Sequence, residues 1–195
     1  MTGKDLDVLV LVGSPREQGR SMRLAKAIEV ALAVHGVKPT LWPLASYPVA
    51  ACYNCGACQR TGVCQVVNDG FGVLARHMES ADLMFCVAPV YFAGPSAHLK
   101  AALDRCQMFW ARKYVLKQEM PPKRPCHLLV VGDGGDPFGT SALETICTSA
   151  LNCANLRIEN NIHRYIGTEP SLDEVSHVVD DALRGIGWLE GEDAR

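Results

Sequence analysis

The sequence lacks a dominant charge of either sign. Nineteen lysines and arginines against 21 aspartates and glutamates leave a formal charge of −2 over 195 residues, without a block of like charges. Chains that bind nucleic acids or anionic membranes by long-range attraction usually carry a strongly basic region. We therefore expect neither nucleic acid nor membrane as a partner.

Long apolar segments are also missing. No stretch reaches the roughly 20 residues that cross a bilayer. Met1–Asp7 is short and charged and precedes only a short apolar run, which is unlike an export signal. The nine cysteines are odd in number, and without an export signal they do not indicate a disulfide framework. We expect a cytoplasmic protein whose clustered cysteines serve metal or redox chemistry.

Internal repeats, low-complexity tracts and linkers are absent as well. We therefore expect one domain over residues 1–195, with a cysteine-rich loop at about 50–69. The loop after the first apolar run has only Gly13 and Gly19, not the Gly-x-Gly-x-x-Gly of a dinucleotide fold, so a mononucleotide is favoured as the tightly held cofactor. No Ser-His-Asp or Cys-His arrangement suggests a protein nucleophile.

A compact group of cysteines is the most informative feature that is present. Cys52, Cys55, Cys58 and Cys64 lie within thirteen residues. The spacing is similar to ferredoxin-type ligand runs, although the last gap is five residues and no proline follows. We favour a 4Fe–4S cluster. Two alternatives stay open: zinc, which usually takes two Cys-x-x-Cys pairs further apart, and thiols that are unligated or joined in disulfides.

Short apolar runs and helical periodicities alternate along the chain. Strands are expected at Val8–Val12, Val37–Leu44, Leu83–Ala88, His127–Val131 and Arg157–Tyr165. Helices are expected from about Ser21 to Gly36 and at Phe71–Met78, Ser96–Trp110, Thr140–Cys153 and Leu172–Trp188. This alternation predicts a three-layer α/β fold with a doubly wound, five-stranded parallel sheet of flavodoxin-like order 2-1-3-4-5.

In such a sheet a ligand binds beyond the carboxyl ends of the strands, where the strand order reverses. The first loop there offers the hydroxyls of Ser14 and Ser21, the charged donors of Arg16 and Arg20, and the amides of a helix N-terminus. These groups suit a terminal phosphate. In the alternative interpretation Ser21 only caps the helix. Two arginines beside a helix N-terminus oppose its dipole, which favours a bound anion.

The second and third loops suit a flat ring. Pro89–Ser96 includes the adjacent aromatic side chains Tyr91 and Phe92, which can border such a ring, although they could instead belong to the core or to a dimer interface. Tyr91 is also a candidate proton donor to a substrate. Gly132–Pro137 lets the backbone approach a ligand closely, or it is an ordinary turn.

Four segments together resemble one known family. They are Gly-Ser-Pro-Arg at 13–16, the cysteine run ending in Thr-Gly-Val-Cys at 61–64, Pro-Val-Tyr-Phe at 89–92, and Leu99-Lys100 with Asp104-Arg105. Over about the first 140 residues, this set resembles the iron–sulfur flavoprotein branch of the NADPH-dependent FMN reductase family. The resemblance implies an FMN-binding, flavodoxin-like subunit that carries a 4Fe–4S cluster and forms a homodimer or homotetramer.

The resemblance also implies roles for individual residues. The FMN phosphate and ribityl would be held by Ser14, Arg16, Arg20, Ser21 and Met22. The isoalloxazine would be lined by Pro89, Val90, Tyr91, Phe92 and Ala93, with Gly132, Asp133 and Gly134 at its rim. The cluster would be ligated by Cys52, Cys55, Cys58 and Cys64. Arg20 departs from the small or amide residue common at its position, and Asn68-Asp69 replaces a more usual acidic pair.

We therefore expect an FMN-dependent oxidoreductase that moves electrons from NAD(P)H or a reduced carrier to a small acceptor. The flavin performs the chemistry, so no catalytic protein residue is required. The alternatives are a flavodoxin-like carrier without its own substrate, a dehydrogenase of a specific metabolite, and a plain FMN or quinone reductase whose cysteine loop is structural. The near-neutral charge and the two loop arginines argue against the carrier, which is typically acidic.

The other polar and sulfur-containing groups are expected to be structural. Cys86, Cys106, Cys126, Cys147 and Cys153 are predicted to pack in the core. Asp104 and Arg105 end a predicted helix and are expected to form a structural ion pair.

Overall fold

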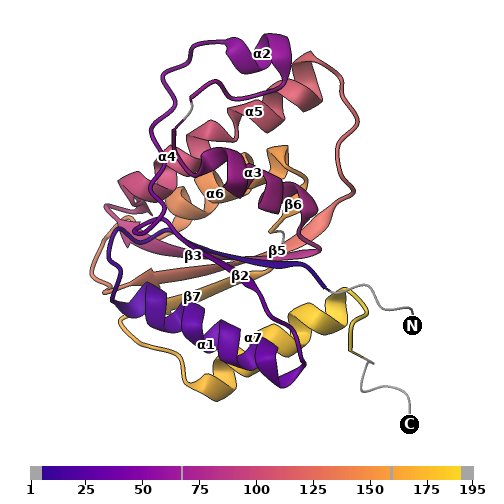
Figure 1. Ribbon diagram of the computed structural model, residues 1–195. Coiled ribbons are helices and arrows are strands. Elements are labelled where there is room, and N and C mark those ends of the chain that lie inside the picture. Colours follow the sequence, from indigo (N-terminus) through magenta and orange to yellow (C-terminus); the bar gives the residue numbers. More distant parts are fainter. Residues whose placement is uncertain (1–5, 67, 159, 190–195) are drawn as a thin grey trace.

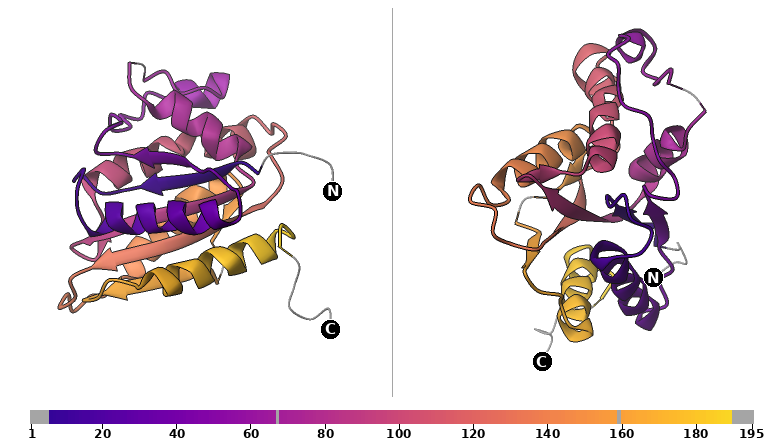
Figure 2. Two further views of the ribbon diagram at one scale, coloured as in Figure 1. Left: turned by 60° about the horizontal axis from the view of Figure 1, so that its bottom comes forward. Right: turned by 90° about the vertical axis from the view of Figure 1, so that its left-hand side faces the viewer.

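A computed structural model describes residues 6–66, 68–158 and 160–189 (Figure 1). A twisted sheet lies between two layers of helices, and the two views of Figure 2 show both layers. The first five residues lie outside the described ranges, so the expected absence of an export signal stays a prediction. No helix in the described ranges is both long enough and apolar enough to cross a membrane.

The elements alternate as the apolar pattern predicted. The strands are β1 (Val8–Val12), β2 (Thr40–Pro43), β3 (Leu83–Tyr91), β4 (Gly94–Pro95), β5 (Arg124–Gly132), β6 (Leu156–Arg157) and β7 (Ile162–Ile166). The helices are α1 (Arg20–Val34), α2 (Ala57–Thr61), α3 (Phe71–Ser80), α4 (Ala97–Arg105), α5 (Gln107–Trp110), the π-helical turn η1 (Ala111–Val115), α6 (Ser141–Cys153) and α7 (Leu172–Gly185).

The predicted fold class is confirmed. Strands β2, β1, β3 and β5 lie side by side and parallel, and both β6 and β7 run parallel beside β5. Helices α1 and α7 cover one face, and α3 to α6 cover the other (Figure 1). The long strands follow the expected order, but within the described ranges the sheet has seven strands rather than five.

Two local features account for the extra strands. The segment 157–165, expected as one strand, is interrupted: β6 pairs with the start of β5, and β7 pairs with its end. The second addition is β4, which folds back antiparallel on the end of β3. The single helix expected over Ser96–Trp110 is likewise divided, into α4 and α5.

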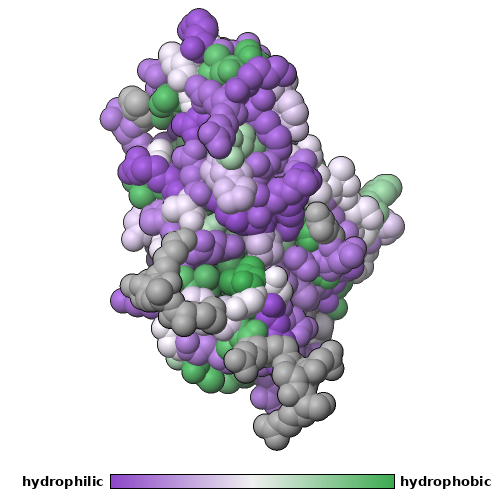
Figure 3. All heavy atoms as spheres, turned by 90° about the vertical axis from the view of Figure 1, so that its right-hand side faces the viewer, coloured by the Kyte–Doolittle hydropathy of each residue, from purple (hydrophilic) through white to green (hydrophobic). Residues whose placement is uncertain are grey.

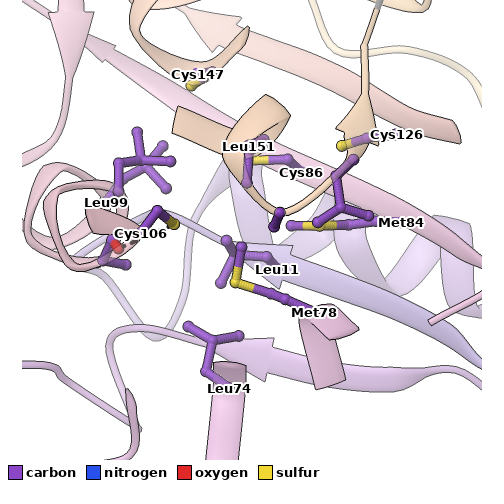
Figure 4. Close-up of a cluster of buried hydrophobic side chains, with 14 of the residues drawn as sticks. Leu11, Leu74, Met78, Met84, Cys86, Leu99, Cys106, Cys126, Cys147 and Leu151 are labelled. Atoms are coloured by element: carbon purple, nitrogen blue, oxygen red, sulfur yellow. Dashed lines mark hydrogen bonds between the residues drawn. The ribbon is translucent and has the colours of Figure 1, made fainter. Parts of the chain in front are cut away.

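The core consists of two clusters separated by the sheet. Every residue of β1 is buried, as expected for a strand covered on both faces. Because successive side chains of a strand point to opposite faces, Val8, Val10 and Val12 pack in the cluster under α1 and α7, whereas Leu9 and Leu11 pack in the other. Figure 4 shows Leu11 among side chains of β3, α3, α4 and α6.

Four of the five cysteines outside the cysteine loop are core residues, as predicted. Cys86, Cys106, Cys126 and Cys147 are buried in the second cluster (Figure 4). Burial raises the pKa of the Cys106 and Cys126 thiols well above the ordinary value, so both stay neutral. Cys153 is only partly buried and packs at the edge of this cluster, which corrects its prediction as a core residue.

A buried arginine joins β5 to the ends of α3 and α6. Arg124, at the start of β5, is 8% exposed, and burial lowers the pKa of its guanidinium. The group donates to five backbone carbonyl oxygens, those of Met78, Glu79, Ala81, Pro122 and Ala154. Three of these oxygens lie at the carboxyl end of α3, where helix carbonyls lack intrahelical partners. Arg124 therefore holds the ends of α3 and α6 to β5.

Replacement of Gly13 by alanine is expected to lower the free energy of unfolding by about 1–3 kcal/mol, as for overpacking. A Cβ atom at Gly13 would lie 2.7 Å from Leu99 Cδ2 and 2.9 Å from Leu99 Cβ. Gly72→Ala in α3 is the control, because its Cβ meets nothing within 4 Å, and it should be neutral or stabilising by up to about 1 kcal/mol. Urea denaturation measures both; equal effects would contradict the close contact of β1 with α4.

Candidate functional site

A crevice opens at the carboxyl ends of β1, β3 and β5, the end that faces the viewer in the right-hand view of Figure 2. Its volume is about 350 Å³, within the usual range of small-molecule sites. The lining residues are Ser14, Arg16, Gly19, Arg20, Ser21, Pro89, Val90, Tyr91, Phe92, Val131, Gly132 and Asp133. The three predicted loops therefore meet around one space. Met22, Ala93 and Gly134 belong to the same loops but do not line it.

The first loop presents the start of α1 to this crevice. The helix begins at Arg20, and its N-cap residue Gly19 has no side-chain cap. The alternative in which Ser21 caps the helix is therefore wrong. The first amides of a helix lack intrahelical acceptors, and no acidic residue lies in this first turn. The loop thus combines free N–H groups, the positive end of a helix dipole and two hydroxyls, which suits an anion.

The two arginines of this loop differ in their surroundings. Arg20 Nη1 donates to the carbonyl oxygen of Gly132 over 3.1 Å and to Asp133 Oδ1 over 2.5 Å, and Nη2 donates to the Thr168 carbonyl. Arg20 therefore ties the first loop to the third. Arg16 is exposed, and its side chain makes no hydrogen bond or ion pair within the described ranges. Arg16 is thus the loop arginine available to an anion.

The second loop is a tight hairpin between β3 and β4. Phe92 and Ala93 have φ angles of +51° and +59°, the pattern of a type I′ hairpin turn, which usually uses Asn or Gly. Such a conformation costs roughly 1–2 kcal/mol for each residue. Phe92 is 99% exposed and Tyr91 40%, so neither is a core aromatic. Exposed aromatic residues beside a strained turn at a crevice are typical of a binding site.

The third loop begins where β5 ends. A Cβ atom at Gly132 would lie 3.0 Å from Ile166 Cδ1 and 3.3 Å from Val90 Cγ2, so a larger residue there would require these two side chains to move by a few tenths of an ångström. Gly134 needs glycine for its backbone, which has a φ of +87°. The alternative interpretation of this segment, an ordinary turn, therefore accounts for Gly134. Gly132 instead allows β5 and β7 to lie close to each other beside the crevice.

The four clustered cysteines line a second pocket, which forms in the loop that follows β2. All four have free thiols. Burial raises the pKa of Cys58, and the neighbouring Cys64, Cys52 and Cys55 raise it further. The four sulfurs are thus close enough for their charges to repel as thiolates, and a cationic group among them would relieve this repulsion.

The cysteine pocket does not present a site for a single metal ion. Within the described ranges, no group of three or more His, Cys, Asp or Glu side chains is arranged to hold one ion. This argues against tetrahedral zinc, whose four sulfurs lie about 2.3 Å from one centre. In a cube each thiolate binds a different iron, so the sulfurs need not converge. The space between the side chains is about 20 Å³, and a cluster would require the loop to widen.

Arg105 closes the base of this pocket. The expected ion pair between Asp104 and Arg105 is wrong, because neighbouring residues on a helix point in different directions. Arg105 Nη1 instead donates to Asp69 Oδ2 over 2.5 Å, and Asp104 pairs with Lys100. The Arg105 side chain is 1% exposed and lies 4.3 Å from the centre of the Phe71 ring.

The same arginine joins both ends of the cysteine loop. Its Nη1 donates to the carbonyl oxygen of Ala50 over 3.3 Å, and its Nη2 donates to that of Val66 over 2.8 Å. Burial alone would raise the pKa of Asp69, but hydrogen bonds from Ala50, Arg105 and Phe71 lower it below its ordinary value. Asp69 is therefore a carboxylate. Sequence reasoning noted both Arg105 and Asp69 but missed their contact, which joins positions 36 apart.

One helix connects the two pockets. The buried Ser96, the N-cap of α4, accepts from Leu99 N and donates to the carbonyl oxygen of Gly13 over 2.5 Å. Arg105 is the last residue of the same helix. At 1.5 Å per residue, the two ends lie roughly 14 Å apart along the axis. The start of α4 thus positions the crevice, and its end positions the cysteine loop. Sequence reasoning missed this role of Ser96.

Two curated proteins with related sequences are named iron–sulfur flavoproteins. The chain is 33% identical over 100 residues to an iron–sulfur flavoprotein of Methanocaldococcus jannaschii, covering 51% of each chain. It is 27% identical over 107 residues to an iron–sulfur flavoprotein of Archaeoglobus fulgidus, covering 55% of this chain and 54% of the relative. The chain thus matches about half the length of these curated relatives.

Solved structures support the fold. An NADH:FMN oxidoreductase superposes with a TM-score of 0.57 at 16% identity, covering 97% of this chain and 92% of the other. A short-chain flavodoxin gives 0.57 at 11%, covering 94% and 99%. A flavone reductase gives 0.64 at 10%, covering 93% and 63%. The sequence model described as NADPH-dependent FMN reductase matches residues 6–152. With this match over most of its length, the chain belongs to the NADPH-dependent FMN reductase family.

Proposed function

We propose that this protein is an FMN-dependent oxidoreductase that takes electrons from NAD(P)H or a reduced carrier and passes them to a small acceptor. The observation that carries the proposal is the meeting of three distant loops around one crevice. One loop offers free amides and Arg16 to an anion, and the others offer aromatic side chains and close backbone to a flat ring. Membership in the FMN reductase family supports the same assignment.

FMN bound in the crevice would supply the electron transfer through its ring. Ser14, Arg16, Ser21 and the first amides of α1 would hold the phosphate, with Met22 beside them. Arg20 would act mainly by fixing the third loop, because Asp133 and Gly132 already occupy its donors.

The ring would be bordered by the second and third loops. Pro89 to Ala93 would form one edge, with Tyr91 placed to donate a proton to a bound substrate, and Gly132 to Gly134 would form the rim. No other protein group is required for the reaction, because the cofactor carries the electrons.

We further propose that the cysteine loop holds a 4Fe–4S cluster, which would supply one-electron transfer. Four free thiols around one pocket, and the mutual repulsion that their thiolates would experience, support this assignment. Both curated relatives are named iron–sulfur flavoproteins. Cys52, Cys55, Cys58 and Cys64 would be the ligands, and α4 would fix their pocket relative to the crevice.

Protein purified without oxygen is expected to be yellow, to release FMN rather than FAD on denaturation, and to contain iron and acid-labile sulfide. Visible absorbance, chromatography of the released flavin and metal analysis measure these three properties. A colourless preparation that FMN cannot reconstitute would reject the flavin site. Iron well below one atom per chain after anaerobic reconstitution would reject the cluster while leaving the flavin assignment intact.

Steady-state oxidation of NADPH and NADH separates the enzyme from a passive carrier. The holoprotein alone is expected to oxidise a reduced nicotinamide nucleotide when a flat acceptor such as a quinone is present. A carrier reacts only after a partner reductase is added, and that result would replace the enzymatic assignment.

We also propose that the protein forms a homodimer or homotetramer. Phe92 of the second loop lines the crevice and is 99% exposed, and Phe138, which follows the third loop, is 82% exposed, so aromatic surface is available for contact with another subunit. On the opposite end, seen in Figure 3, the coloured surface is mostly hydrophilic, with its apolar side chains in separate groups. Light scattering coupled to size-exclusion chromatography tests the assembly, and a monomer at micromolar concentration would contradict it.

A further inference from the structure

The guanidinium of Arg105 has one donor left over. Its Nη1 and Nη2 atoms donate to Ala50, Val66 and Asp69 around the cysteine loop. Its Nε atom is buried and has no hydrogen-bond partner within the described ranges. A buried donor without an acceptor is costly, and more so when the group is charged. The fold therefore lacks an acceptor beside Arg105 Nε.

The position of Arg105 indicates where that acceptor belongs. Five buried side-chain nitrogen or oxygen atoms in the described ranges have no partner, and of the residues that carry them only Arg105 lines the cysteine pocket. Its terminal nitrogens are fixed to both arms of the loop, and the Phe71 ring lies against the guanidinium. The side chain therefore cannot turn away to find another acceptor.

We propose that Arg105 is a positioning residue for the group bound in the cysteine pocket, and that its Nε–H donates a hydrogen bond to an anionic sulfur of that group. This inference rests on the proposed thiolate-bound cluster. Hydrogen bonds to sulfur and the net charge nearby are two of the levers that set a cluster's reduction potential. A donor and a positive charge both favour the more negative, reduced form, so Arg105 raises the potential.

The charge around the pocket agrees with this role. Asp69 is the one carboxylate paired with Arg105 within the described ranges, and it balances the arginine before any ligand binds. Because Asp69 already balances Arg105, four thiolates in the pocket would add negative charge that this ion pair leaves unbalanced. The arginine thus lies where it can offset negative charge on the sulfurs, while the backbone carbonyls of Ala50 and Val66 keep it in place.

The decisive measurement is the reduction potential of the reconstituted cluster in Arg105→Lys, by anaerobic titration followed by electron paramagnetic resonance. Lysine keeps the positive charge but removes the Nε donor. We expect the ratio of reduced to oxidised cluster at a fixed potential to fall at least tenfold, which is about 59 mV towards lower potential for one electron.

Arg112→Lys is the matched control. Arg112 also grips the cysteine loop, because its Nε donates to the carbonyl oxygen of Gly62 over 2.5 Å and it pairs with Glu79. It does not line the cysteine pocket. If loosening the loop were enough to change the potential, this variant would change it too. We expect the potential of Arg112→Lys to equal that of the unmodified protein.

Asp69→Asn gives a second test with the opposite sign. It leaves Arg105 in place and removes its balancing charge, so the potential should rise. This variant decides the question if Arg105→Lys fails to retain FMN and iron. An unchanged potential in Arg105→Lys, or shifts of equal sign in the two variants, would overturn the role of Arg105 alone. An unmodified protein that binds no iron would overturn it together with the proposed cluster.

Discussion

Riboflavin is expected to bind at least about 100-fold more weakly than FMN. The difference is the phosphate, which in the proposed function the first loop would hold with Arg16, hydroxyls and the free amides of α1. A hydrogen bond to a charged group contributes about 1.5–3 kcal/mol. Loss of two such bonds removes at least about 3 kcal/mol, more than two powers of ten in Kd. Quenching of flavin fluorescence during titration of the apoprotein measures both constants.

Arg16→Ala tests whether Arg16 contributes to the preference for FMN over riboflavin. It should weaken FMN binding by about 1.5–3 kcal/mol, or about 10- to 150-fold, and leave riboflavin binding unchanged. Arg23→Ala is the control, because Arg23 lies in the first turn of α1, close to this loop, but pairs with Glu169 outside the crevice, and it should change neither constant. An equal loss for FMN and riboflavin in Arg16→Ala would show that the arginine acts elsewhere than at the phosphate.

Arg124→Met is expected to lower the free energy of unfolding by at least about 3 kcal/mol, because each buried polar group left without its partner costs about 1–3 kcal/mol. The methionine fills similar space but leaves five backbone carbonyl oxygens without their donor. Because α3 and α6 both end at this side chain, we expect the variant to lower the stability of the whole fold and not of one helix alone. Urea denaturation followed by circular dichroism measures it.

Two further variants test the cause. Arg124→Lys keeps the charge but has fewer donors in a less suitable geometry, so its loss should be smaller than that of methionine. Arg23→Met removes an exposed arginine whose partner Glu169 is also exposed, and no measurable change is expected. A lysine variant as stable as the unmodified protein would show that charge alone, not the set of carbonyl contacts, matters at Arg124.

Sequence reasoning succeeded where the information is local. The continuous apolar runs at Val8–Val12 and Leu83–Ala88 report burial on both faces, which a parallel sheet between helices requires. The alternation of strands and helices predicted the strand order. That order in turn predicted that the three loops meet, because parallel strands bring their carboxyl ends to one edge of the sheet. The crevice was thus predictable without any knowledge of side-chain contacts.

The pairing of charged residues was not predictable in the same way. Arg20 contacts Asp133 across 113 positions, and Arg105 contacts Asp69 across 36. The periodicity of apolar residues indicates which face of a helix or strand is buried. It does not indicate which distant carboxylate a buried arginine contacts. The break between β6 and β7 escaped prediction for a related reason, since Asn161 N donates to the carbonyl oxygen of Ile158 between the two strands, a contact that the apolar pattern does not show.

The nine residues of α4 also act as a spacer of fixed length and fixed rotation. One inserted residue would lengthen the helix by about 1.5 Å and rotate its far end by about 100° relative to Ser96. Such an insertion would move Arg105 away from the cysteine loop without changing any cysteine or any residue that is proposed to contact the flavin. The distance between the crevice and the cysteine pocket can therefore change only in steps of one residue, and each step also changes the orientation of one pocket relative to the other.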